Sequence, residues 1–205
     1  MKKTDITKEK TNAPAGLLAV DIDGTLITDS GEITGRVYRA LERTVESGWE
    51  VVIATGRTLY AARRILDGLP FVRYALCSNG AAVVDVTEGD ILHLKTIPPE
   101  SVRAAVPFFR SRSAVPVLYN TDIIGQKMYY DTVEGACEFF TWYVNNDPRS
   151  TRVDDIMDFA GEVQQIGSIA PRDNIFGLRD DLAAVSVVPM TLPFESPHFG
   201  GKNHD

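Results

Sequence analysis

Short apolar runs separated by helical patterns mark the first half of the chain. Residues 17–20 and 49–55 predict two strands, and residues 74–77 predict a third. The first run is continuously apolar and ends at Asp21, which is typical of a strand buried on both faces of a parallel sheet. A turn is expected at Asp23 and Gly24, directly after this strand.

Two helices are expected between these strands. Thr34 is a suitable N-cap for a helix whose apolar positions recur at helical spacing, and Gly48 is well placed to end it. A second helical pattern spans residues 59–69 and stops before Pro70. Alternating strands and helices predict right-handed crossovers, a parallel sheet of the α/β class and a ligand site at the carboxyl ends of the strands.

The pattern changes from about Ile91 onward and predicts a second, α+β domain. We expect a disordered leader over residues 1–15, a first domain over 16–95 and a second over 96–205. The elements expected in the second domain are helices over 101–112, 133–144 and 174–182, with strands over 115–119, 127–130, 163–170 and 184–190.

Charge and composition narrow the possible partners. The formal net charge is -7 and the sequence pI is about 5.0, so nucleic acid and anionic membranes are not expected as main partners. A small anionic ligand remains possible where local groups supply positive potential. No apolar run reaches the roughly 18 residues of a membrane span, and the polar N-terminus lacks a signal-peptide core. These features favour a cytoplasmic protein, in which Cys77 and Cys137 are expected as buried thiols.

Two carboxylates at the end of the first strand are the sharpest chemical signal. Asp21 and Asp23 flank Ile22, and alternate side chains of an extended chain lie on one side. Both acids can therefore address one site, where carboxylate oxygens attract Mg²⁺. One acid can attack phosphorus while the other handles the proton of the leaving group. Residues 21–24 could alternatively form an ordinary solvated turn, since Asp and Gly are common turn residues. The apolar strand that precedes them favours a functional site instead.

Polar motifs also follow the second and third strands. Thr55, Gly56 and Arg57 come at a strand end before a helix, where a hydroxyl and free N–H groups can hold a phosphate oxygen. A simple helix cap would explain Thr55 equally well. Ser78 and Asn79 follow the third strand, where either a plain turn or a substrate-facing Asn79 is possible.

Three consecutive strand ends with these motifs resemble the haloacid dehalogenase superfamily, in particular its Cof-type phosphatases with a type IIB cap. The resemblance implies an incomplete Rossmann-like core and a cap that covers the site and selects the substrate. It also implies Mg²⁺ as cofactor and an aspartyl-phosphate intermediate. The implied residues are the nucleophile Asp21 and the acid–base Asp23, both also metal ligands, and the phosphate- or substrate-binding Gly24, Thr55, Gly56, Arg57 and Asn79.

Two further motifs of that superfamily, a lysine and a late acidic segment, have no clear match. Lys202 is a poor candidate for the lysine, and Asp180 and Asp181 are expected on a solvated helix face. The cluster of Pro197, His198, Gly200 and His204 is expected to be loop rather than a metal site. We therefore expect a truncated chain or a partner that completes the sheet, with the strand over 17–20 as an exposed edge that favours self-association.

Three functions remain open. The leading one is a Mg²⁺-dependent phosphatase of small phosphorylated metabolites, by default sugar phosphates, with activity impaired by the missing motifs. A non-catalytic phosphate-binding or regulatory module would keep Asp21, Thr55 and Asn79 without turnover. A receiver-like phospho-acceptor is disfavoured because about half of the chain lies beyond the third strand.

Overall fold

The chain folds into two compact units in the computed structural model, which describes residues 13–122 and 125–182. Among these, residues 13–57 and 61–92 form the first unit, and residues 58–60 group with those from 93 onward in the second. The predicted strand over 184–190, Lys202 and the cluster around His198 and His204 lie outside the described residues, as does most of the expected leader.

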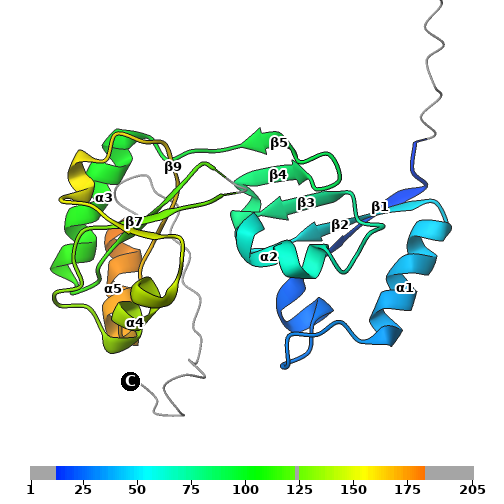
Figure 1. Ribbon diagram of the computed structural model, residues 1–205, viewed down its shortest axis with the longest axis horizontal. Helices are drawn as coiled ribbons and strands as arrows, with labels where there is room; N and C mark the ends of the chain where they lie inside the picture. Colours follow the sequence, from blue (N-terminus) through cyan, green and yellow to red (C-terminus); the bar gives the residue numbers. More distant parts are fainter. Residues whose placement is uncertain (1–12, 123–124, 183–205) are drawn as a thin grey trace, which may run out of the picture. The chain divides into compact units, whose positions relative to one another are not determined.

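The first unit is built on a five-stranded sheet in the order β1-β2-β3-β4-β5 (Figure 1). Its first three strands pair in parallel, which confirms the α/β class and the predicted strand order. β4 runs antiparallel to β3 and was not predicted. The strands are β1 (Gly16–Val20), β2 (Trp49–Ala54), β3 (Tyr74–Cys77), β4 (Ala82–Asp85) and β5 (Asp90–Leu94).

Both crossover helices of this sheet are present where expected, as α1 (Gly35–Glu46) and α2 (Leu59–Leu66). The Thr34 hydroxyl accepts a hydrogen bond from the Val37 N–H at 3.3 Å, so the predicted cap is confirmed. Gly48 follows α1 with φ +86°, a conformation that glycine adopts without strain. Because the chain crosses the sheet in one direction, right-handed crossovers place both helices on the same face (Figure 1).

Among the strands that the structure describes, β1 lies at one edge of its sheet, as predicted. The expectation that it is buried on both faces is wrong, since its residues alternate between exposed and half-buried and Leu17 is 62% exposed. The continuously buried strand is β2, where Val51, Val52 and Ile53 all lie in the core. An edge strand has a neighbour on one side only, so an apolar sequence does not ensure its burial.

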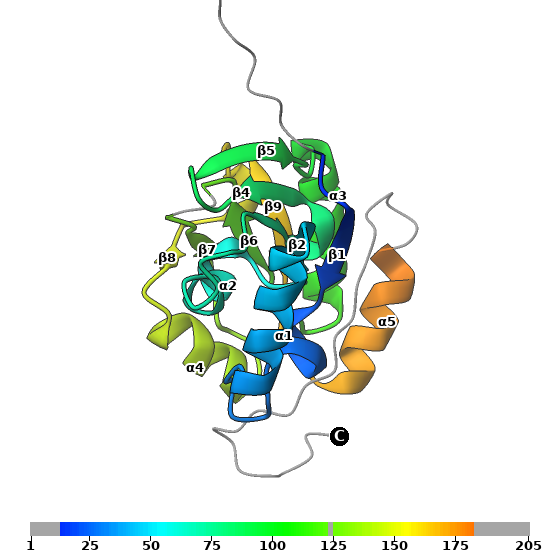
Figure 2. The same cartoon turned by 90° about the vertical axis from the view of Figure 1, so that its right-hand side faces the viewer.

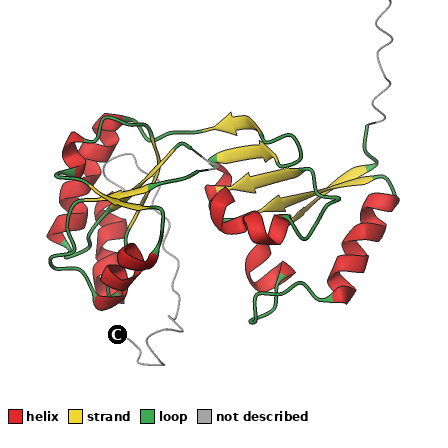
Figure 3. Cartoon of the chain, viewed as in Figure 1, coloured by secondary structure: helices red, strands yellow, loops and turns green. Residues whose placement is uncertain are grey.

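The second unit holds a four-stranded mixed sheet in the order β8-β7-β6-β9, which confirms the α+β character of this half (Figure 3). On one face, Val102 of α3 packs against Leu118 of β6. On the other, Phe140 of α4 packs against Val117, the neighbour of Leu118 in the strand. The strands are β6 (Val117–Asn120), β7 (Met128–Tyr130), β8 (Ser150–Arg152) and β9 (Val163–Gly167), and the helices are α3 (Pro99–Ser111), α4 (Glu138–Asn146) and α5 (Arg172–Leu182).

Helix α5 lies beside α3 (Figures 1 and 2). Leu178 and Leu182 of α5 form a buried cluster with Ala105 and Phe109 of α3. The predicted helix over 174–182 is therefore confirmed. Asp181 on this helix is not simply solvated, because its carboxylate accepts a hydrogen bond from Arg112 Nε at 2.9 Å.

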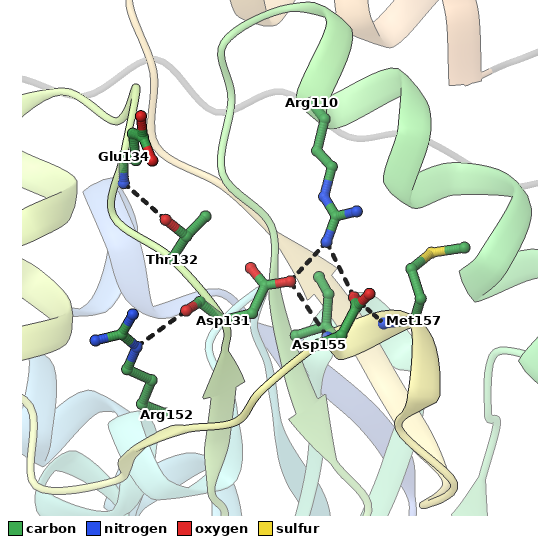
Figure 4. A network of polar contacts seen from close by, with 8 residues as sticks. Arg110, Asp131, Thr132, Glu134, Arg152, Asp155 and Met157 are labelled. Carbon is green, nitrogen blue, oxygen red and sulfur yellow. Dashed lines mark hydrogen bonds and ion pairs between the residues drawn. The ribbon is translucent and has the colours of Figure 1, made fainter.

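A buried carboxylate joins three segments of the second unit (Figure 4). Asp131 follows β7 and is 8% exposed. Its Oδ2 accepts hydrogen bonds from Arg110 Nη2 of α3 at 2.6 Å and from the Ile156 N–H at 3.2 Å. Arg110 also pairs with Asp155 at 3.1 Å, and Arg152 Nε donates to the Asp131 carbonyl. One side chain thus fixes α3 and the loop after β8 to the end of β7.

Both cysteines are free thiols, as predicted. Cys77 ends β3 in the core, and burial raises the pKa of its thiol to about 11. Cys137 lies just before α4 and is only partly buried, which corrects the expectation of two buried thiols. Within residues 13–122 and 125–182, no helix is long and apolar enough to cross a membrane.

Candidate active site

The three predicted motifs converge at one edge of the first sheet. β1, β2 and β3 end at Val20, Ala54 and Cys77, and their parallel register brings these ends side by side. Backbone hydrogen bonds then link the segments that follow. The Asn79 N–H donates to the Thr55 carbonyl at 3.3 Å, and the Ser78 N–H donates to the Arg57 carbonyl at 2.8 Å.

A tight turn after β1 holds the two acidic residues outward. Ile22 and Leu26 are 0% and 2% exposed, so they anchor the turn η1 (Ile22–Leu26) in the core. Asp21 and Asp23 on either side of Ile22 are exposed. Gly24 has φ +70°, which side chains rarely adopt, so the turn requires glycine there. The predicted presentation of both carboxylates beside a glycine turn matches this geometry.

The Asp21 carboxylate is partly fixed by its own backbone. Its Oδ1 accepts a hydrogen bond from the Ile22 N–H at 2.7 Å, with Asp21 in an extended conformation. This contact limits rotation of the side chain without covering it. An exposed carboxylate held in one orientation can act as a nucleophile or as a metal ligand.

The Asp23 carboxylate is held by Arg57 from the second motif. Arg57 Nη2 donates to Asp23 Oδ1 at 2.7 Å, and Nε donates to Oδ2 at 2.9 Å. The hydrogen bond with Asp23 raises the pKa of Arg57 against the opposing effect of burial, and the charges of Asp23 and Asp21 raise it further. This bidentate ion pair between Arg57 and Asp23 was not predicted, although both residues were assigned to the site.

Thr55 is buried at the end of β2, with 5% of its surface exposed. Its hydroxyl oxygen accepts a hydrogen bond from the Arg57 N–H at 3.1 Å. Since α2 begins only at Leu59, Thr55 closes a turn before the helix rather than capping it. The hydroxyl proton is not used in this bond, so it can be donated to a ligand oxygen.

Asn79 lies over Gly56. A Cβ atom at Gly56 would come within 2.8 Å of Asn79 Oδ1, so a larger residue there would displace the amide. Asn79 and Ser78 both have positive φ, +57° and +51°, in a region that asparagine tolerates better than most residues. The exposed side chain of Asn79 is consistent with a ligand-facing role.

Sequence reasoning assigned no role to the Ser78 side chain. Ser78 is 6% exposed, and its hydroxyl has no hydrogen-bond partner among the described residues. A buried hydroxyl without a partner is uncommon in folded proteins. Nothing in the sequence marks Ser78 apart from its place beside Asn79, because a hydroxyl's partners depend on the folded loop.

The described residues offer two carboxylates for a cation here and no larger cluster. Within the described ranges, no three acidic, histidine or cysteine side chains gather in a way that could hold a metal ion. Mg²⁺ commonly binds through one or two carboxylates and keeps several waters or substrate phosphate oxygens. Asp21 fits such a role, whereas both Asp23 side-chain oxygens are engaged by Arg57.

Comparison with known proteins identifies relatives of this chain. The profile of the haloacid dehalogenase-like hydrolase family matches residues 18–169. A *Bacillus subtilis* 5-amino-6-(5-phospho-D-ribitylamino)uracil phosphatase is 33% identical over 81 residues, which are 38% of this chain and 32% of that protein. An *Escherichia coli* pyridoxal phosphate phosphatase is 30% identical over 82 residues, 40% of this chain and 30% of that protein.

Solved structures share the fold. A haloacid dehalogenase-like hydrolase from *Bacteroides thetaiotaomicron* superposes with a TM-score of 0.64 at 18% identity, covering 82% of this chain and 63% of that one. A structure described as a subclass IIB sugar phosphatase has a TM-score of 0.59 at 19% identity, with the same coverage. The matched stretches are about a third of these curated relatives and less than two thirds of these solved chains. The family profile matches most of the length of this chain, and the chain therefore belongs to the haloacid dehalogenase-like hydrolases.

Proposed function

We propose that the first unit hydrolyses phosphate monoesters of small metabolites, with Asp21 as nucleophile and Mg²⁺ as cofactor. The observation that carries this proposal is that Asp21, Thr55 and Arg57 follow the ends of the adjacent strands β1 and β2. Arg57 is hydrogen-bonded to Thr55 at 3.1 Å and to Asp23, two residues from Asp21, at 2.7 Å. A nucleophile, a hydroxyl donor and a guanidinium around one point suit a tetrahedral anion.

The proposed reaction has two displacements at phosphorus. A carboxylate oxygen of Asp21 attacks phosphorus, the ester P–O bond breaks, and the leaving oxygen takes a proton from Asp23. Water then attacks the aspartyl-phosphate and gives a proton to Asp23. Inorganic phosphate leaves and the Asp21 carboxylate is regenerated. Asp23 can carry the transferred proton only after Arg57 releases at least one of its oxygens, because both oxygens accept hydrogen bonds from the Arg57 guanidinium.

The remaining site residues bind and orient the phosphoryl group. The hydroxyl proton of Thr55 can be donated to a phosphate oxygen, and the backbone around Gly24 is open to a close approach. When Arg57 turns from Asp23 toward the phosphate, its planar donors suit two phosphate oxygens. Mg²⁺ would be held by Asp21 and, once Arg57 has released the carboxylate, by Asp23, and it would neutralise charge on the phosphoryl oxygens.

The second unit is proposed to act as the cap that selects the substrate. This assignment rests on its α+β fold and on the likeness to the subclass IIB sugar phosphatase. Sugar phosphates are the default substrates for the same reason. Two free thiols fit a reducing compartment, so we place the protein in the cytoplasm.

Phosphate release from a panel of phosphomonoesters with Mg²⁺ tests the proposal. The chain is compared with Asp21→Asn, which keeps the size of the side chain but removes the nucleophilic oxygen. We expect a loss of about 10³-fold or more in kcat, as for removal of other nucleophiles. A single turnover in heavy-oxygen water should label the released inorganic phosphate and leave Asp21 unlabelled, because water attacks phosphorus and not the carboxyl carbon of the aspartyl-phosphate.

Asp29→Asn is the matched control, since Asp29 is an exposed acid in the loop that follows the same turn. It should leave turnover unchanged. Equal loss in both variants, or turnover that survives Asp21→Asn, would show that Asp21 is not the nucleophile.

The Arg57–Asp23 pair favours a second candidate function, a phosphate-binding module without turnover. In this case the pair persists when phosphate binds, and Asp23 never carries a proton. Calorimetry with inorganic phosphate and vanadate distinguishes the two functions. Binding that is unchanged by Asp21→Asn, in a chain without hydrolysis, supports the binding module, whereas turnover that depends on Asp21 excludes it.

A further inference from the structure

The second unit contains a cavity of about 340 Å³ between its sheet and helix α4. Two adjacent strands form its floor, because β6 and β9 pair Tyr119 with Gln165 and Val117 with Gly167. Directly opposed residues of paired strands lie on the same face of a sheet. Helix α4 adds Phe139 and Tyr143 to the wall.

The wall is aromatic and uncharged. Tyr119, Phe139 and Tyr143 line it, and every lining side chain that the structure describes is neutral. The phenol groups of Tyr119 and Tyr143 lie 3.3 Å apart, and Arg149 Nη2 donates to the Tyr143 oxygen at 3.4 Å. Burial raises the pKa of Tyr119 well above its ordinary value, so its phenol stays protonated. The cavity therefore suits an uncharged group.

Two polar atoms in the wall lack partners. Gln165 Oε1 and Ser168 Oγ are both buried and have no hydrogen-bond partner among the described residues, and both residues line the cavity. Leaving a buried polar atom unpaired is unfavourable, because the atom loses its hydrogen bonds to water without gaining another partner. Apolar pockets with a few convergent polar atoms are typical of small-molecule sites. A ligand that pairs with these two atoms would explain why polar groups occupy these positions.

Gly167 allows the Tyr119 ring to approach the end of β9 closely. A Cβ atom there would lie 3.1 Å from this ring. A flat aromatic surface beside a glycine accommodates a planar ring better than a branched or puckered group. The Ser168 hydroxyl and the Gln165 amide can then meet the edge of that ring, since each can donate or accept a hydrogen bond.

We propose that this cavity binds a neutral planar heteroaromatic ring whose edge carries N–H and C=O groups, with Gln165 and Ser168 reading that edge. The site is separate from the residues at the strand ends of the first unit, and the proposal does not depend on their reaction. The ring could belong to a phosphorylated substrate or to an unphosphorylated effector, which share this chemistry.

Calorimetric titration of the full chain with uridine tests the proposal. Uridine offers a planar ring with one N–H and two C=O groups. We expect it to bind, with N3-methyluridine about three- to tenfold weaker because it lacks the ring N–H. Dihydrouridine keeps the polar edge but loses planarity, and should also bind more weakly.

Three variants separate recognition from folding. Ser168→Ala and Gln165→Met each remove one unpaired polar atom, and each should weaken uridine binding about three- to tenfold without lowering the melting temperature. Ser150→Ala is the matched control, because Ser150 Oγ is also buried without a partner but does not line the cavity. It should leave binding unchanged.

The proposal is overturned if none of the nucleosides binds at about 1 mM, where even weak sites are occupied. It is also overturned if binding is insensitive to both Gln165→Met and Ser168→Ala. Uridine monophosphate, titrated in the Asp21→Asn background, identifies the source of the ring. Tighter binding than uridine, reversed by inorganic phosphate, indicates a substrate, and equal binding of the two indicates an effector.

Discussion

At the scale of single residues, the contact between Gly56 and Asn79 sets the shape of the candidate active site. The two loops approach so closely that a Cβ atom at Gly56 would lie 2.8 Å from the Asn79 amide oxygen. Asn79 also anchors its own loop through the hydrogen bond to the Thr55 carbonyl. Adding one methyl group at Gly56 would therefore disturb both the loop after β2 and the loop after β3.

We expect Gly56→Ala to displace Asn79 and to lower kcat/KM for phosphomonoesters about ten- to a hundredfold, because small misplacements in a site have large effects on rate. Steady-state kinetics measures this, together with the affinity for vanadate. Gly35→Ala is the control, since Gly35 is an exposed residue at the start of α1 and meets only a flexible arginine side chain. An active Gly56→Ala variant would show that the Asn79 position is not critical.

The residue types of the site could be predicted, but not all of their contacts. Acidic residues before a glycine and a threonine at a strand end are visible as local patterns, and the structure brings Asp21 and Thr55 to the same edge. The pair between Arg57 and Asp23 could not be predicted in this way. Such a pair depends on side-chain conformations across a space that only the folded sheet defines.

At the scale of elements, hydrophobic period identified every α-helix and six of the nine strands among the described residues, and it missed β4, β5 and β8. The helix after Thr34 was expected and is present, because a cap and a repeated apolar spacing agree. β8 has three residues, of which none is apolar, so it shows no strand period. Helix α4 begins at Glu138 rather than at 133, because Gly135 has a φ of +79°, which is incompatible with a right-handed helix.

The exposed edge of β1 gives a prediction about association. Leu17 is 62% exposed on this strand, so we expect copies of the chain to associate through it at high concentration. Leu17→Lys should reduce the weight-average mass in sedimentation equilibrium without loss of stability, because little buried surface is removed. Val133→Lys, at a partly exposed apolar residue of the second unit, is the control. Unchanged association in Leu17→Lys would place the contact elsewhere.

The link between α3 and the end of β7 depends on Arg110. Asp131 remains buried when Arg110→Met removes its guanidinium partner, so we expect a loss of about 1–3 kcal/mol in the free energy of unfolding (Figure 4). Urea denaturation measures it. Arg103→Met on an exposed position of the same helix should have little effect. If the two variants are equally stable, another group must replace Arg110 as the partner of the buried Asp131 carboxylate.

At the scale of the whole molecule, each unit carries one of the two tryptophans, Trp49 in the first and Trp142 in the second. Each unit also has an aspartate that is stabilised in its ionised form. Burial raises the pKa of Asp147, but hydrogen bonds from Arg149 and its charge lower it more, so the pKa is below its usual value. In the first unit, Arg73 and two backbone N–H groups similarly lower the pKa of Asp85 against burial.

The lowered pKa values of these two aspartates determine how the stability of the protein changes with pH. An aspartate whose pKa is lower in the folded state stabilises the protein above the unfolded value of about 3.9, and this contribution disappears as the pH falls through the folded value. Asp147→Asn should therefore lower the stability of the second unit by about 2 kcal/mol at neutral pH. The difference from the parent chain should shrink below about pH 4.

Urea unfolding followed by Trp142 fluorescence, in a Trp49→Phe background, measures this effect at several pH values. Asp154→Asn, at an exposed aspartate near the same loop, is the control and should show little effect at any pH. A difference that stays constant from neutral to acidic pH would show that Asp147 acts through packing instead of charge.

The unequal environments of the two cysteines make the chain convenient for site-specific labelling. The Cys77 thiol is buried and stays protonated near neutral pH, so it should resist alkylation in the folded protein. Cys137 is partly exposed, and its sulfur donates to the carbonyl of Ile169, a residue that lines the cavity of the second unit. A fluorophore coupled to Cys137 in the unmodified sequence would sit beside that cavity and report directly when a ring enters it.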